Sequence, residues 1–176
     1  MGIFNFKHTS ADKFIKNHHK AGDAGREFET KIIKRVGVLA EISLIQTYDF
    51  TKRLSDRLNL APDELKVGLF DVLGKDNTMD VYRSFSENDF GLYGKIKSEA
   101  LNKFVKTEYD LLINYCDPQL LFPKVIMLKS AAKIKAGFED ELNFFNDVSI
   151  KVPRNDIDGF NKELLRYLSI LKLIEN

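Results

Sequence analysis

The sequence predicts a single α/β domain, a three-layer sandwich with a mostly parallel sheet and helices on both faces, and three observations support this fold class. Residues 109–116 read Tyr-Asp-Leu-Leu-Ile-Asn-Tyr-Cys and lack the alternation of a half-exposed strand, as expected for a strand covered on both faces. Residues 133–138 alternate charged and apolar side chains, which is typical of a strand nearer a sheet edge. The apolar run between them fits a crossover helix, so this stretch predicts a right-handed β-α-β unit.

Composition favours one soluble domain. The chain has 176 residues, of which 44% are hydrophobic and 30% charged, as in ordinary globular proteins. The net charge of +1 argues against a chain-wide field that would attract nucleic acid or membrane. The single cysteine, Cys116, excludes an intrachain disulfide and suits a reducing compartment. Without a run of about 18 apolar residues or a secretory signal, we expect a cytoplasmic protein.

The first part of the chain, residues 1–34, is expected to be a basic arm attached to a domain formed by residues 35–176. Ser10 is a candidate cap for a short basic helix, and Gly22 and Gly25 predict a flexible link after it. The arm is either a solvated terminus that packs two or three phenylalanines on the domain, or a contact for an anionic partner. In either case we expect residues 1 to about 30 to be dispensable for folding.

Neither a metal site nor a cofactor is expected. All the histidines, His8, His18 and His19, lie in the arm and lack cysteine or carboxylate partners at ligand spacing. The Gly-x-Gly-x-x-Gly dinucleotide fingerprint and the Gly-x-Ser-x-Gly nucleophile elbow are both missing from the sequence.

After the arm, apolar runs predict strands at 36–42 and 65–72. Between them, a helix is expected over 49–58, because apolar residues recur at every fourth position. These residues are Phe50, Leu54 and Leu58.

The connection over 74–97 is long for a compact domain. It contains four aromatic residues, and Ser86 and Asp89 have the spacing of a capping box, which predicts one helical turn. The connection is either a loop held in place by its aromatic residues or a lid over a ligand.

In the second half of the chain, residues 98–106 predict a helix. Asp117 and Pro118 supply a helix cap and a first-turn proline for the crossover helix. We expect that helix to be kinked, or to start late, at Pro123, because proline lacks a backbone donor and crowds the preceding turn.

A fifth strand is predicted at 147–152, where Val148, Ile150 and Val152 share one face. The last helix should begin at a cap on Asn155 or Asp156, because apolar residues then recur at spacings of three and four.

With the strands numbered along the chain, we expect the five-stranded sheet order 2-1-3-4-5, which opens a crevice at the carboxyl ends of strands 1 and 3. A helix N-terminus at that point favours an anion, although the Asp117 carboxylate would oppose one. Cys116 is either a nucleophile or a structural thiol, and Asn114 either holds a neighbouring loop or faces a ligand. The candidate ligand-binding residues are Ser43, Thr47, Asn114, Cys116, Asp117 and Gln119.

Several stretches resemble an uncharacterised bacterial family of small single-domain α/β proteins. They are Tyr-Asp-Leu-Leu-Ile-Asn-Tyr from residue 109, Ala-Lys-Ile-Lys-Ala-Gly-Phe from 132, Asp-Phe-Gly-Leu-Tyr-Gly-Lys from 89, and the closing helix. The likeness covers most of residues 30–174 and implies no established activity. Residues 109–114 and 134–138 are also similar to the N-terminal domain of lipopolysaccharide heptosyltransferases, which bind a nucleotide-sugar mainly through a second domain for which this chain is too short.

These observations favour a non-catalytic interaction or accessory module with an unknown protein partner. The alternative is a small-ligand or nucleotide-sugar-related binding protein or enzyme that uses the crevice for a small anionic ligand. A third reading, binding of an anionic surface through the basic arm, predicts an affinity that falls steeply with salt.

Overall fold

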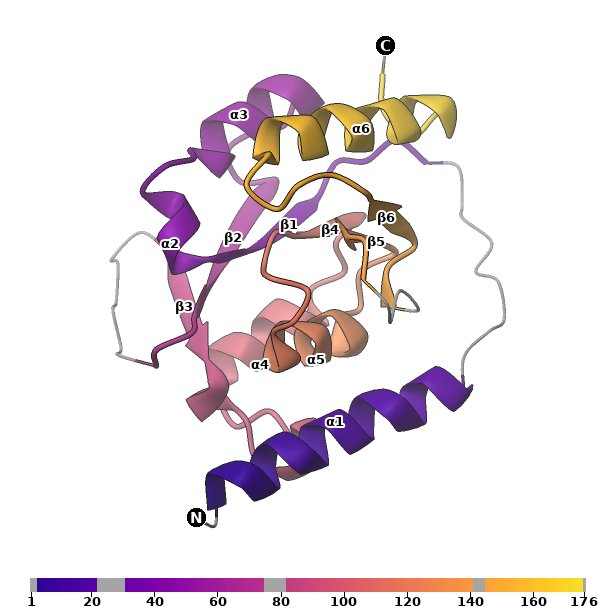
Figure 1. Ribbon diagram of the computed structural model, residues 1–176. Helices are drawn as coiled ribbons and strands as arrows, with labels where there is room; N and C mark the ends of the chain where they lie inside the picture. The colour runs from indigo at the N-terminus through magenta and orange to yellow at the C-terminus, as the bar shows by residue number, and fades with distance from the viewer. Residues whose placement is uncertain (1–2, 22–30, 75–81, 141–144, 176) are drawn as a thin grey trace.

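The computed structural model describes residues 3–21, 31–74, 82–140 and 145–175, and confirms the predicted α/β fold class (Figure 1). Within these residues, six parallel strands form one sheet in the order β3-β2-β1-β4-β5-β6. The strands are β1 (Val36–Glu41), β2 (Leu65–Asp71), β3 (Arg83–Ser86), β4 (Leu111–Asn114), β5 (Ile134–Phe138) and β6 (Val148–Ile150).

The prediction of five strands is wrong by one. The five expected strands are present and keep the expected order 2-1-3-4-5, but β3 adds an edge strand beside β2. This strand lies in the connection that we expected to be a loop. Its four residues include Ser84 and Ser86, so it carries too short and too polar a pattern to stand out in the sequence.

Helices cover both faces of the sheet (Figure 1). Helices α3 and α6 lie on one face, α4 and α5 lie on the other, and α1 forms a further layer outside α5. The helices are α1 (Ile3–Ala21), α2 (Ile42–Ile45), α3 (Phe50–Leu58), α4 (Glu99–Lys106), α5 (Leu121–Lys129) and α6 (Ile157–Ile170), with 3-10 turns η1 (Glu87–Asp89) and η2 (Leu92–Gly94). Among the described residues, no helix combines the length and apolar character that crossing a membrane needs.

The sheet separates two apolar clusters, one on each face. In β4, Leu111 and Ile113 belong to the cluster under α3 and α6, whereas Leu112 belongs to the cluster under α4 and α5. In β1, Val38 and Leu39 divide in the same way. This explains why the central strands read as continuous apolar runs, and it confirms that β4 is covered on both faces.

Side-chain caps start three of the predicted helices, and the cap at Asp156 is one of the two that the sequence predicts for the last helix. Asp49 accepts a hydrogen bond from the Lys52 N–H (3.0 Å) at α3, and Asp156 accepts one from the Gly159 N–H (2.8 Å) at α6. Ser98 caps α4, and the predicted capping box from Ser86 to Asp89 is present at η1.

The expected cap of α5 is wrong, whereas its late start is confirmed. The Asp117 carboxylate accepts a hydrogen bond from the Gln119 N–H (2.8 Å), and the Leu120 N–H donates to the Asp117 carbonyl (2.9 Å). This Asx turn satisfies the backbone before the helix begins at Leu121. Pro123 therefore falls within the first turn, where its missing N–H removes no helical hydrogen bond.

The N-terminal segment forms a longer helix than expected, beginning before Ser10 rather than after it. Helix α1 packs against η2 and α5, and buries Ala11 and Ile15 in the cluster under α4 and α5. Ser10 is itself buried, and its hydroxyl accepts a hydrogen bond from the Tyr93 N–H (3.0 Å). The expected flexible link at Gly22 and Gly25 lies outside the described residues.

Candidate functional site

The predicted crevice lies where β1 and β4 end side by side. The connection from β1 leads to α3 on one face, and the connection from β4 leads to α5 on the other (Figure 1). Asn114, Cys116, Asp117 and Gln119 lie together on the β4–α5 connection. On the β1 side, Ser43 lies in α2 and Thr47 lies just beyond it. The residues predicted to form the walls of a crevice thus lie at the ends of these two neighbouring strands, on the connections that follow them.

The polar groups of these walls bind one another. The Asn114 amide oxygen accepts a hydrogen bond from the Cys116 N–H (3.0 Å), and the Thr47 hydroxyl donates to the Leu44 carbonyl (3.1 Å). The Glu41 carboxylate crosses from β1 and accepts a hydrogen bond from the Asp117 N–H (2.7 Å). Since these groups satisfy the backbone of their own loops, they stabilise the connections between strands and helices.

Charge at this point does not favour an anion. The Glu41 and Asp117 carboxylates both lie here, and Asp117 forms an ion pair with Arg154. The Gln119 N–H, which a phosphate would need, already donates to Asp117. An anionic ligand would therefore have to displace two carboxylates from their present partners.

Cys116 is buried, and its burial raises the pKa of the thiol well above its ordinary value; the negative charges of Glu41 and Asp117 add to this shift. A protonated thiol is a weak nucleophile, so this environment favours a structural thiol. Among the described residues, no group of three histidine, cysteine or acidic side chains lies close enough to hold a metal ion.

A hydrogen-bonded chain of side chains under α6 was not anticipated from the sequence. The Tyr115 hydroxyl donates to the Asn161 amide oxygen (2.5 Å), and the Asn161 amide nitrogen donates to the Tyr48 hydroxyl (2.7 Å). The Tyr48 hydroxyl in turn donates to Asp158 (3.2 Å). Tyr115 and Asn161 are both buried, so this network lies inside the apolar cluster and fixes α6 to the sheet.

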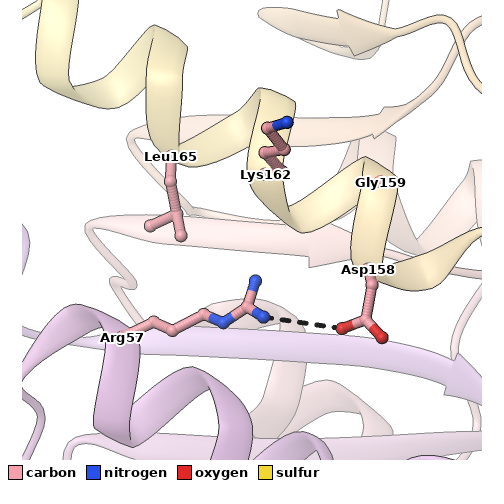
Figure 2. A pocket seen from close by; sticks show the side chains of 5 residues that line it. All are labelled: Arg57, Asp158, Gly159, Lys162 and Leu165. Carbon is pink, nitrogen blue, oxygen red and sulfur yellow. Dashed lines mark ion pairs between the residues drawn. The ribbon is translucent and has the colours of Figure 1, made fainter.

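The network reaches the surface at a pocket of about 560 Å³ between α3 and α6. Figure 2 shows Arg57 extending from α3 towards Asp158 at the start of α6. Arg57 and Asp158 form an ion pair (3.6 Å), and Arg53 donates to both oxygens of the same carboxylate (3.0 Å each). The carboxylate is therefore shared by two arginines, and the arrangement serves to join α3 to α6.

A larger groove, of about 780 Å³, runs along the edge of the sheet at β2. Strand β1 pairs with Leu65–Phe70 of β2 on one side, whereas β3 lies beside only Gly68–Asp71 on the other. On that outer side, no described strand lies along the first three residues of β2, Leu65–Val67. The residues that line this edge groove are Arg35, Asp49, Thr51, Lys52, Asp63, Leu65, Lys66, Val67, Tyr82, Arg83, Ala100, Lys103, Phe104, Thr107 and Tyr109.

The edge groove combines an apolar floor with an excess of positive charge. Leu65, Val67 and Phe104 contribute apolar surface, and two tyrosines add aromatic rings. Five cations line the groove against two carboxylates. The cations are Arg35, Lys52, Lys66, Arg83 and Lys103. None of the five forms an ion pair with a described residue.

None of the six predicted ligand-binding residues lines the edge groove, the pocket of Figure 2, or a third, smaller pocket beside Asn59. The groove could not be found from the sequence, because its cations are scattered from residue 35 to residue 103 and only the sheet order brings them together. The one available signal was the long connection over 74–97, which supplies Tyr82 and Arg83.

Comparison with known proteins identifies a family but no activity. Residues 7–171 match the model of a family of unknown function, DUF6913. The matched range begins in α1 and ends at the C-cap of α6, so it includes the whole sheet and every residue of the edge groove. Neither a curated protein nor a solved structure matches the chain.

Proposed function

We propose that this chain, which belongs to the DUF6913 family of unknown function, is a non-catalytic interaction module of the cytoplasm that binds a partner protein through the edge groove. The observation that supports this function is a set of five cations that form no ion pair with a described residue. They surround an apolar floor at the amino end of β2, where no described strand covers the outer side. An exposed sheet edge is a common place for one protein to bind another.

The state of the predicted crevice supports a non-catalytic role. Catalytic side chains need access to a substrate and a suitable protonation state. Cys116 is buried with a raised pKa, and the polar groups of Asn114 and Asp117 hold their own connection. A buried, reduced cysteine also suits the cytoplasm.

Affinity capture from the source cell tests the proposal. The bait is the full chain in three forms: wild type, a groove variant with Lys66→Glu and Arg83→Glu, and a control variant with Lys13→Glu and Lys162→Glu. All four positions are exposed, and the two double variants change net charge equally. We expect a protein that is retained by the wild type and by the control variant, and is lost with the groove variant. Identical captured proteins on all three baits would contradict the proposal.

A thermal-shift screen with nucleotides, sugar phosphates and simple anions tests the alternative, a small-ligand protein that uses the crevice. A compound that raises the melting temperature of the wild type, and loses this effect in both Asn114→Ala and Gln119→Ala, would favour that alternative. If no compound stabilises the chain, or if stabilisation survives both substitutions, the crevice is a feature of the fold alone.

A further inference from the structure

Building on the proposed function, we infer that the edge groove binds an acidic, extended polypeptide segment of the partner. The inference depends on the shape of the groove, on the direction of the backbone groups at its floor, and on its charge.

The groove lies beside the amino end of β2, where Leu65–Val67 line it. On one face it is lined by Thr51 and Lys52 in the first turn of α3, and on the other by Ala100 in the first turn of α4. Two further residues line the groove towards the amino end of β2. Arg35 immediately precedes β1, and Asp63 lies two residues before β2. The three residues of β2 that line the groove span about 10 Å at a rise of about 3.3 Å per residue. The groove therefore accommodates a short extended segment beside the amino end of the strand, with its ends reaching towards the helices on the two faces.

The backbone of β2 faces the groove at alternate residues. The Val36 N–H donates to the Glu64 carbonyl (2.8 Å), so the backbone groups of Glu64 and Lys66 face β1. Because backbone groups in a strand alternate in direction, the N–H of Val67 faces away from β1, towards the groove. Val67 is partly exposed, and β3 begins only opposite Gly68. Within the part of the chain that the structure describes, no backbone carbonyl outside the sheet ladders accepts a hydrogen bond from the Val67 N–H. An extended peptide can therefore place a carbonyl against this N–H, as in strand addition.

The charge of the groove selects an acidic segment. Lys52 lies on the α3 side, Lys103 on the α4 side, and Lys66 and Arg83 at the sheet edge between them. The opposing Asp49 carboxylate already caps α3. In an extended peptide, side chains alternate between two directions, so acidic residues of one segment can reach cations on both walls. Several such pairs together raise the association rate and select against basic partners.

A charge-swap experiment tests this inference on the full chain. The probes are fluorescein-labelled seven-residue peptides in which glutamate alternates with valine or threonine, or lysine replaces each glutamate. Binding is measured by fluorescence anisotropy at low ionic strength with the wild type, the groove variant and the control variant. We expect the acidic peptide to bind the wild type and the control variant, and to bind the groove variant about tenfold more weakly. We expect the lysine peptide to prefer the groove variant.

Amide exchange, followed by nuclear magnetic resonance, supplies a second readout. Binding of the acidic peptide should slow exchange of the Val67 amide in the wild type, because that N–H becomes hydrogen-bonded. Equal affinity of the acidic peptide for the groove and control variants would overturn the inference, as would the absence of any binding to the wild type. A single-stranded oligonucleotide serves as a further probe. If it binds the wild type more tightly than the acidic peptide does, and binds the groove variant more weakly than the wild type, the groove would be assigned to nucleic acid instead.

The outcomes separate this inference from the proposed function. If the acidic peptide fails but the groove variant still loses a captured protein, the groove is an interaction surface for a partner of another chemistry. If the captured proteins are also unchanged, both conclusions fail. Thermal melts of both double variants establish that each is folded, so that lost binding reports on the surface.

Discussion

Replacing Asn161 by alanine should strongly destabilise the protein, because this side chain joins two tyrosine hydroxyls inside the cluster under α6. Asn161 accepts a hydrogen bond from Tyr115 (2.5 Å) and donates one to Tyr48 (2.7 Å). Tyr115 is buried, so after the substitution its hydroxyl has neither a protein partner nor ready access to water. Tyr48 retains Asp158 (3.2 Å) and loses less.

The magnitude follows from these contacts. A buried hydroxyl left without a partner costs about 1–3 kcal/mol, and the cavity left by the amide adds to this, giving about 2–4 kcal/mol in total. For a chain of this length, 1 kcal/mol corresponds to roughly 2–4 °C in melting temperature. We therefore expect the Asn161→Ala variant to melt about 5–15 °C below the wild type, as measured by circular dichroism.

A double-mutant cycle shows whether the hydrogen bond causes the loss. Tyr115→Phe removes the hydroxyl and should cost about 1–2 kcal/mol, while the combined variant should cost less than the sum of the two single changes by at least about 0.5 kcal/mol. Asn155→Ala, at an exposed asparagine just before α6, is the matched control and should change stability by less than about 0.5 kcal/mol. Strict additivity, or an Asn161→Ala variant that melts with the wild type, would refute the reasoning.

Three further predictions concern pH, the N-terminal helix and a turn. Burial raises the Cys116 pKa above that of the unfolded thiol, which is about 8.5. The contribution of the buried thiol to stability is therefore complete below that pH and declines as pH rises. Between about pH 8 and 10, the free energy of unfolding in urea should fall less for the Cys116→Ala variant than for the wild type. Residues 31–176 alone should still melt cooperatively in calorimetry, but with about 2–4 kcal/mol less stability, because α1 buries Ile15; a non-cooperative melt would show that α1 is required for folding. Gly94→Ala should cost about 1–3 kcal/mol by chemical denaturation, since Gly94 has φ +64° and an added Cβ would lie 2.9 Å from Val125; unchanged stability would mean that the turn relaxes freely.

The parts of the fold that the sequence predicted depend on local patterns. The apolar run through Leu111 and Ile113 predicted a strand covered on both faces, the apolar residues at every fourth position predicted α3, and a cap on Asn155 or Asp156 predicted the start of α6. In each case the residues that form the sequence pattern also make the stabilising contact, either with the backbone of their own helix or with the helices that cover the sheet.

The parts that were missed depend on tertiary contacts or on competition between local structures. Strand β3 is stabilised by pairing with β2 and by Phe85, whose ring packs on Phe104 with centroids 5.2 Å apart. At Asp117, the carboxylate can cap a helix or close an Asx turn, and the residue pattern does not separate the two. The length of α1 was missed because, over residues 6–18, whose side chains the structure describes, only Ala11 and Ile15 are buried apolar residues.

The two candidate surfaces differ in how their charges are satisfied, and this difference decides between them. At the crevice, the carboxylates of Glu41 and Asp117 have partners on neighbouring connections, so their charges stabilise the fold. At the edge groove, Lys66 and Arg83 form no ion pair with any residue in the ranges that the structure describes. Cations at an open sheet edge often prevent unwanted pairing with other strands. That role is compatible with the inferred one. Positive charge repels a basic strand and offers no ion pairs to a neutral strand, but it attracts an acidic strand. If the inferred binding of an acidic segment holds, the same charges would exclude most other extended chains from this edge.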